Sequence, residues 1–438
     1  GGTTTSSLAV ITGESVKYVR LNGLYSNEHD PNIMMNRGSY LLPYEEPGNV
    51  INYEYIPKLS TDKLDMKAIE MEIVGGTGGK YDNRYPIPAR IRPDIRSSEN
   101  KVPLWLAEDG QTLYGQTGSS LLKSTDNWET TETVHTFDGV GLLSAVRDLR
   151  NGELVVCQDR HDGSQTRARV WVSENYSNPD AETTWTQVLE GSTQSARFTN
   201  YWGISVYDNI VFLSEYGNRG EAGKAYLSID YGKTFKVAYD LYADPATPDV
   251  PQAHIHSCAY DPYWNRFWLT VGDASNSATL YSDDFCETWK FIDNYHMRQG
   301  TGKDAYQFVT IIPMPNCVLF ASDRSRMAQG YAPNGIYRLE RTEENRINAT
   351  YEDIEIAYQF DDSPDLTYMG RMGFQRFGKD EPMYITAGKP GGSPRSNPGI
   401  VLATFDGYKF HNIYTDTDGE GFGTYTFVGP TNDGKVIG

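Results

Sequence analysis

The stretch "YLSIDYGKTF", Tyr226–Phe235, decides the fold. It places a hydroxyl, a short acid and a glycine at alternate positions, Ser228, Asp230 and Gly232, and it ends on Thr234 beside an aromatic ring. An aspartate in this position can accept hydrogen bonds from nearby backbone N–H groups, and glycine permits a left-handed turn. The pattern therefore predicts a locked hairpin, with the aspartate as a fold element rather than a catalytic acid.

The motif recurs along the chain. "KSTDNWETTE" repeats it around Asp126, and "YSDDFCETWK" repeats it around Asp284. The opening serines are 104 and then 54 residues apart, and 104 is twice 52, so a weaker copy is expected near residue 176. "VWVSENYSNPDAETTW" supplies that copy, with Asn175 in place of the acid. Repeats of this length indicate propeller blades or a solenoid.

A second pattern lies between the motifs: an apolar strand, a turn and another strand, as in "GLLSAVRDLRNGELVVCQD". Each repeat thus supplies four short strands, and the motif joins the third to the fourth. A solenoid needs only one or two strands per repeat, so the pattern favours an all-β fold of the β-propeller type. The repeats begin near Val102, Gly141, Tyr201, His254, Tyr306 and Thr367.

Six complete blades are expected from these starts, and the tail "GTYTFVGPTNDGKVIG" adds two strands. N-terminal strands such as "SVKYVRL" would complete a seventh blade and close the ring. We therefore expect seven blades, with six as the alternative. Residues 1–96 are expected to hold the closing strand and an irregular arm or cap, and residues 97–438 the propeller.

Composition agrees with this class and limits the partners. The 438 residues include 13% aromatic residues, 42 Gly and 22 Pro, which suit strands and turns. A formal net charge of -19 predicts no binding of nucleic acid. No apolar run is long enough to cross a bilayer, so no membrane insertion is predicted. Cys157, Cys258 and Cys317 stand in apolar runs and are expected to be buried free thiols.

The motif Ser-x-Asp-x-Gly-x-Thr-Trp/Phe resembles the Asp-box, a repeat of the sialidase-like superfamily, and the resemblance covers roughly residues 85–438. The chain looks most similar to bacterial and phage propellers that are loosely labelled sialidase-like or glycosyl hydrolases. The resemblance implies three arginines for a substrate carboxylate, a tyrosine nucleophile supported by a glutamate, and an aspartate acid/base. It places an acid and an arginine at Asp159 and Arg160. The family's Arg-Ile-Pro motif is only approached by "ARIRPDIR", which carries Arg90 and Arg92, so the resemblance implies the fold more strongly than the chemistry.

Long polar segments follow each second strand and precede each first strand, and function concentrates in loops held by a rigid scaffold. Carboxylates, arginines, histidines and aromatic rings gather there, which is the chemistry of sugar recognition. The candidate catalytic residues are His254, His256, Tyr306, Asp323 and Asp159. The candidate substrate-binding residues are Arg147, Arg160, Arg197, Trp202, Glu215, Asp273, Arg324, Tyr368 and Arg371.

Several of these residues have a second interpretation. His254 and His256 could bind a metal, although a third ligand at fixed spacing is missing, or could act with Tyr306 in a lyase-like proton abstraction. Asp159 either caps a loop turn or functions in the site, and Arg147 forms either a channel ion pair or an anion clamp. No cofactor is assigned, and a divalent cation such as calcium stays open.

Two functions of different classes follow. The first is a glycan-cleaving enzyme, a sialidase-like glycoside hydrolase or, as the lesser alternative, a polysaccharide lyase. The second is a non-catalytic glycan-binding or structural propeller, such as a receptor-recognition part of a phage tail or a surface assembly component that docks through its N-terminal arm. Both predict a glycan or polysaccharide partner and an extracellular, cell-surface or virion location.

Overall fold

The computed structural model describes residues 101–139, 141–159, 167–199, 202–218, 220–243, 254–272, 277–292, 307–322, 335–360, 369–374, 383–388, 400–415, 428–429, 431–432 and 437. All of them belong to one compact unit, residues 90–377 and 383–438. The predicted arm and closing strand of residues 1–96 lie outside these ranges.

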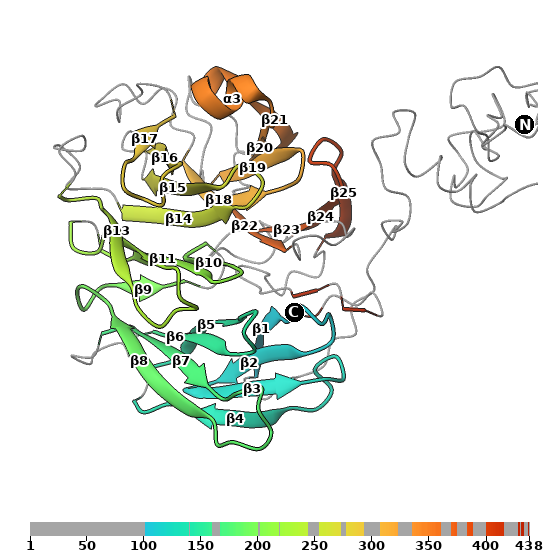
Figure 1. Ribbon diagram of the computed structural model, residues 1–438. Helices are drawn as coiled ribbons and strands as arrows, with labels where there is room; N and C mark the ends of the chain where they lie inside the picture. The colour runs from blue at the N-terminus through green and yellow to red at the C-terminus, as the bar shows by residue number, and fades with distance from the viewer. Residues whose placement is uncertain are drawn as a thin grey trace, which may run out of the picture. The chain divides into compact units, whose positions relative to one another are not determined.

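Six antiparallel sheets, numbered here in chain order, make up the described part of the chain (Figure 1). Sheet 1 holds β1 (Val102–Leu106), β2 (Leu113–Thr117), β3 (Ser120–Ser124) and β4 (Glu132–Thr136). Sheet 2 holds β5 (Leu143–Asp148), β6 (Leu154–Gln158), β7 (Arg169–Glu174) and β8 (Thr184–Glu190). Sheet 3 holds β9 (Arg197–Phe198), β10 (Ile204–Tyr207), β11 (Ile210–Tyr216), β12 (Lys224–Ser228) and β13 (Lys236–Asp240).

Sheet 4 holds β14 (His254–Asp261), β15 (Arg266–Gly272), β16 (Ala278–Ser282) and β17 (Lys290–Phe291). Sheet 5 holds β18 (Phe308–Pro313), β19 (Cys317–Ser322), β20 (Gly335–Glu340) and β21 (Ile354–Gln359), with the helices α3 (Glu343–Asn348) and η4 (Tyr351–Asp353) between its last two strands. Sheet 6 holds β22 (Met369–Phe374), β23 (Met383–Gly388), β24 (Ile400–Thr404) and β25 (His411–Thr415).

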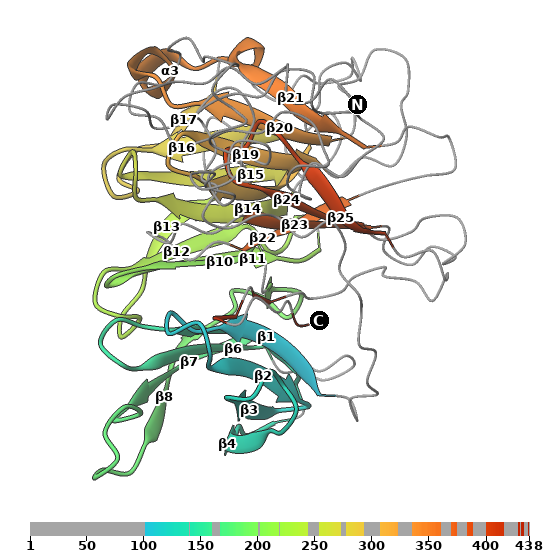
Figure 2. The ribbon, with the colours of Figure 1, turned by 90° about the vertical axis from the view of Figure 1, so that its right-hand side faces the viewer.

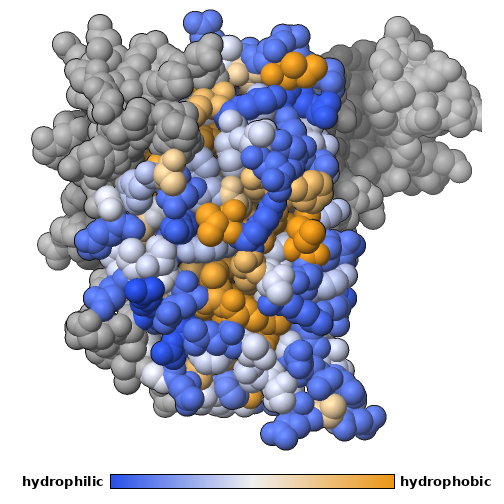
Figure 3. Space-filling view, turned by 60° about the vertical axis from the view of Figure 1, so that its left-hand side comes forward, coloured by the Kyte–Doolittle hydropathy of each residue, from blue (hydrophilic) through white to orange (hydrophobic). Residues whose placement is uncertain are grey.

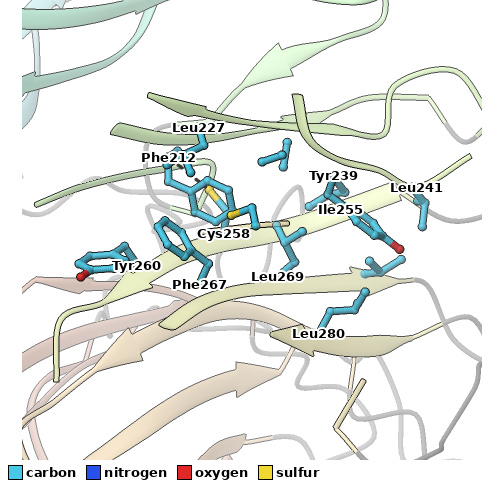
Figure 4. Packing of buried hydrophobic residues seen from close by; sticks show 14 of the residues in the cluster. Phe212, Leu227, Tyr239, Leu241, Ile255, Cys258, Tyr260, Phe267, Leu269 and Leu280 are labelled. Atoms are coloured by element: carbon cyan, nitrogen blue, oxygen red, sulfur yellow. Dashed lines mark hydrogen bonds between the residues drawn. The ribbon is translucent and has the colours of Figure 1, made fainter. Parts of the chain in front are cut away.

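In each sheet four strands form a meander and pair in the order of the sequence, as predicted for the repeat, and in sheet 3 the short β9 also pairs with β11. Successive sheets pack face to face in a propeller-like arrangement, and Figure 2 shows sheets 2 to 5 as consecutive layers. The core between sheets 3 and 4 is typical, with Phe212, Ile255, Phe267 and Leu269 all fully buried (Figure 4). The all-β, four-stranded prediction is therefore confirmed.

In sheets 2 and 4 the aromatic residue that closes the motif packs on the sheet before it. Trp289 follows the hairpin of sheet 4 and packs on Phe212 and Tyr239 of sheet 3, with ring centroids 6.4 and 5.4 Å away. Trp185 of sheet 2 packs in the same way on Phe137 of sheet 1, at 4.9 Å. Burying a ring of this size stabilises the junction by about 2 kcal/mol. The predicted packing of closing aromatics between sheets is confirmed at these two junctions.

The surface of the described part carries no broad apolar face in the view of Figure 3, where apolar side chains lie in small groups among hydrophilic ones. Single exposed apolar residues such as Ile229, Val237 and Phe285 are ordinary features of a protein surface. Among the described residues, no helix is long and apolar enough to cross a membrane.

Candidate functional site

The aspartates of the three full motifs are bound within their own hairpins. Asp230 accepts hydrogen bonds from the Ser228 hydroxyl (2.7 Å), the Thr234 backbone N–H (3.0 Å) and the Thr234 hydroxyl (2.6 Å). The Ser228 oxygen in turn accepts the N–H of Gly232, whose φ is 77°. The hairpins of Asp126 and Asp284 repeat these contacts. The predicted structural role of the three aspartates is confirmed.

In sheet 2 a carboxylate from another hairpin binds the serine of the motif. Glu153, in the turn between β5 and β6, accepts hydrogen bonds from the Ser173 hydroxyl (2.6 Å) and from the backbone N–H groups of Asn175 (2.9 Å) and Tyr176 (3.1 Å). Asn175 is left-handed, with φ 64°, whereas the full motifs are left-handed one and two residues later, as at Tyr231 and Gly232. The carboxylate missing from this copy of the motif is therefore supplied by the preceding hairpin, on a turn of different backbone conformation.

The connections between second and third strands and between fourth and first strands leave the sheets at one rim, which we call the mouth, because the strands are antiparallel. The first strands share an irregularity near it. In sheets 1, 2, 4, 5 and 6 one residue has no partner on the second strand, and the register shifts around it. These residues are Leu104, Ser144, His256, Val309 and Arg371. A bulge of this kind re-aims side chains and is common beside functional sites.

Sheet 3 departs from this pattern. Phe198 pairs with Glu215 and Ile204 pairs with Leu213, so five residues stand opposite Ser214, a net insertion of four where the other sheets insert one. We call residues 199–203 the excursion; of these, Thr199, Trp202 and Gly203 are described. The predicted binding residue Trp202 is half-buried, and its backbone oxygen accepts the N–H of Cys258 from β14 at 2.7 Å.

Four of the predicted site residues meet at the mouth through one that the sequence reasoning missed, Tyr216. The Nε of Arg197 lies 3.9 Å from an Asp159 oxygen, and Arg197 pairs across the sheet with Tyr216. The Tyr216 ring centroid is 4.5 Å from that of His254 and 6.5 Å from that of His256. Asp159 and Arg197 keep 24% and 39% of their side chains exposed, so both are accessible to a ligand.

The two histidines are fixed by backbone carbonyl groups of neighbouring sheets. Nδ1 of His254 lies 3.1 Å from the Gly217 oxygen, and Nδ1 of His256 lies 3.1 Å from the Phe308 oxygen. A carbonyl oxygen can only accept, so each Nδ1 is the donor of its hydrogen bond, and Nε2 is the nitrogen that carries the lone pair when the ring is neutral. The ring centroids are 4.9 Å apart, and the residues are only 7% and 2% exposed. Gly272 makes room for His256, because a Cβ there would overlap its ring.

Glu215 and Arg147 lie in the structural interior. The Glu215 carboxylate is fully buried and accepts four hydrogen bonds, from the Ser192 N–H (2.6 Å), the Ser192 hydroxyl (2.7 Å), the Lys224 N–H (3.3 Å) and the Tyr226 hydroxyl (2.8 Å). Burial and the Glu215 charge raise the pKa of Tyr226. Arg147 is buried, with its guanidinium 4.1 Å from the Trp105 ring centroid.

The other seven predicted site residues lie either on β22 or outside the described ranges. Arg371 is placed on β22, at the bulge position. Six predicted residues lie outside the described ranges: Tyr306, Asp323, Arg160, Asp273, Arg324 and Tyr368. No group of three or more His, Cys, Asp or Glu side chains within the described ranges is arranged to hold a metal ion. All four cysteines are buried and free, as predicted for Cys157, Cys258 and Cys317.

Comparison with models of protein families gave no match, and comparison with curated proteins gave none either.

Proposed function

We propose that the protein recognises a glycan at the mouth, with Tyr216 and Arg197 as the contacting side chains. The observation that carries the proposal is the Tyr216 ring, whose centroid lies 4.5 Å from that of His254, on a residue that pairs across the sheet with Arg197, the ion-pair partner of Asp159. An aromatic face packs against the apolar side of a sugar ring, and a guanidinium–carboxylate pair can donate to and accept from its hydroxyl groups. The near burial of both histidines supports recognition ahead of cleavage.

The test is binding of the full chain to an array of neutral and acidic oligosaccharides, with Tyr216→Ala and Arg197→Ala beside the wild type. Each variant is expected to lose about tenfold or more in affinity, because stacking and charged hydrogen bonds each contribute more than about 1 kcal/mol. Tyr263→Ala, in the β14–β15 turn away from the mouth, is the matched control. A wild-type protein that binds no member of the array would refute the proposal.

Cleavage by elimination is the second candidate, and the histidine tautomers favour it. The Nε2 lone pair of a neutral histidine would take the proton from the sugar carbon next to a carboxylate, and the C–H electron pair would form a C=C bond as the C–O bond to the neighbouring sugar breaks. The imidazolium would then return its proton to the departing oxygen, which leaves as an alcohol. The product is an unsaturated sugar that absorbs ultraviolet light. Release of this product from a uronate polysaccharide, and its loss in His254→Gln, would support elimination. Binding without release would support recognition alone.

The propeller-like unit is proposed to hold seven blades, with the C-terminus in the closing one. Val428 and Ile437 form an antiparallel bridge that packs against Leu106 and Leu113 of sheet 1, where a preceding sheet would lie. Asn432 adds hydrogen bonds to the backbone oxygens of Gly110 and Asp109 in the same sheet. Removal of residues 428–438 should therefore lower the unfolding temperature of the whole unit. An unchanged unfolding temperature would contradict a closing role.

A further inference from the structure

We infer that the excursion of sheet 3 determines which glycan the mouth accepts, an inference that rests on the proposed function. The starting point is the repeat itself. Five first strands insert a single residue at this place, whereas sheet 3, among the six described sheets, inserts four, because its residues 199–203 stand opposite one residue, Ser214. Thr199 follows Arg197 by two residues and Gly203 lies opposite Ser214, next to the strand that carries Tyr216.

The described residues of the excursion, Thr199, Trp202 and Gly203, are held by backbone hydrogen bonds. The N–H of Gly203 donates to the Thr199 oxygen at 3.1 Å, and the Gly203 oxygen accepts the N–H of Ser214 at 2.9 Å. A third hydrogen bond, from Cys258 to the Trp202 oxygen, ties it to the neighbouring sheet. Groups held in this way before a ligand arrives lose little entropy on binding, which is how a rigid platform gains affinity and selectivity.

The described side chains of the excursion suit a sugar. Trp202 is half-buried and offers the largest stacking face of any side chain. The Thr199 hydroxyl oxygen is buried and has no hydrogen-bond partner among the described residues, and a buried polar atom of this kind calls for a water or a ligand hydroxyl. A pyranose ring could stack on Trp202 and donate a hydrogen bond from one of its hydroxyl groups to the Thr199 hydroxyl oxygen.

Gly203 provides a way to move the excursion without touching a binding side chain. A Cβ at this position would lie 2.6 Å from the Thr199 hydroxyl oxygen and 2.9 Å from the Thr199 backbone oxygen. Gly203→Ala must therefore displace the turn, while Arg197, Tyr216 and Trp202 keep their identity. A second variant replaces residues 199–202 with one serine, the residue that occupies the bulge of sheet 2, so that this serine and Gly203 stand opposite Ser214 as a one-residue insertion.

The experiment compares the order of preference on the oligosaccharide array for the wild type, Gly203→Ala, the one-serine replacement and Trp202→Ala, with Tyr263→Ala as control. We expect the ratio of affinities between the preferred and the next glycan to fall about tenfold in the first two variants, with weak binding retained through Tyr216 and Arg197. Trp202→Ala should weaken the preferred glycan about tenfold and keep the melting temperature within a few degrees of the wild type.

The outcomes separate the two proposals. Variants that bind with the wild-type order of preference would overturn the inference and leave glycan recognition standing. A wild type without any bound glycan would overturn both. If the one-serine replacement does not fold, Gly203→Ala and Trp202→Ala decide the matter, because each changes a single residue and can be checked for folding by its circular dichroism and melting curve.

Discussion

The motif hairpins and the mouth handle polar groups in opposite ways. In each of the three full motifs, the aspartate is satisfied by residues two and four positions away. At the mouth, the contacts cross from sheet to sheet: His254 reaches Gly217, 37 residues back, and His256 reaches Phe308, 52 residues on. The hairpins are self-contained units of structure, whereas the mouth exists only when neighbouring sheets are assembled. A carboxylate in a hairpin therefore contributes to stability, and side chains at the mouth are available for recognition.

The largest expected effect is a loss of stability on mutating Glu215, a residue close to the mouth. Glu215 belongs to the strand that carries Tyr216, yet its carboxylate is fully buried by four protein donors. Glu215→Ala should lower the free energy of unfolding by about 3–5 kcal/mol, because buried donors lose their charged acceptor. Urea unfolding measures this cost, with Glu190→Ala on exposed β8 as the control. A stable variant that had lost glycan binding would instead restore Glu215 as a contact residue.

A smaller effect is expected in a hairpin. Asp230→Ala removes the acceptor for Ser228 and for both groups of Thr234, and should cost about 2 kcal/mol of unfolding free energy. Glycan affinity should stay at the wild-type value, because the hairpin between third and fourth strands lies at the rim opposite the mouth. Denaturation and array binding on the same sample measure both quantities. Loss of affinity in a fully folded Asp230→Ala would show that the two regions are coupled.

Sheet 2 allows the comparison to be sharpened. Glu153→Ala should cost about 1–2 kcal/mol, because the hydroxyl of Ser173 and the N–H groups of Asn175 and Tyr176 lose their acceptor. Asn175→Gly keeps the left-handed backbone and should be close to neutral, although Asn175 is the residue that stands at the aspartate position of the sequence motif. If the two variants lost equal unfolding free energy, measured by thermal unfolding, this would argue against Glu153 as the residue that takes the place of the motif aspartate.

The smallest expected effect is a dependence of the unfolding free energy on pH below about 4. The Thr130 hydroxyl and backbone N–H lower the pKa of Asp126 from 3.8 to about 2, and Thr288 does the same for Asp284. A carboxyl whose pKa is lower in the folded state stabilises that state above the unfolded value, and this contribution is lost as the pH falls from about 4 to about 2. Unfolding free energies of the wild type and of an Asp126→Asn/Asp284→Asn variant should converge over that interval. Parallel curves would contradict the hydrogen-bonded hairpins as the source.

The parts of the fold that follow from local sequence could be predicted. The hydrogen bonds of the Ser-x-Asp motif join residues at most four positions from the aspartate. The role of Asp230 and the order of the strands around it could therefore be predicted from the sequence alone. The carboxylate of Glu153 was not, because it lies in a different hairpin, 20 residues before Ser173. Only a model of paired strands brings those two residues together.

The candidate site was predicted less completely for the same reason. The long polar segments indicated the rim, and Asp159, Arg197, His254 and His256 do converge there. Tyr216 ends an apolar strand, where a tyrosine usually belongs to the core, so the surrounding sequence did not mark it as a site residue. The bulges are shifts of one residue in strand register, which a pattern of alternating side chains does not resolve. In the sequence, the excursion is marked by Gly203, the residue at which it ends.

The buried thiols have a practical consequence. Cys157, Cys258 and Cys317 stand in the sheets numbered 2, 4 and 5, each with its pKa raised by burial to about 12. A thiol without access to solvent does not meet an alkylating reagent until its own sheet opens. Pulse alkylation followed by mass spectrometry would therefore time the opening of individual sheets, with no probe engineered into the chain.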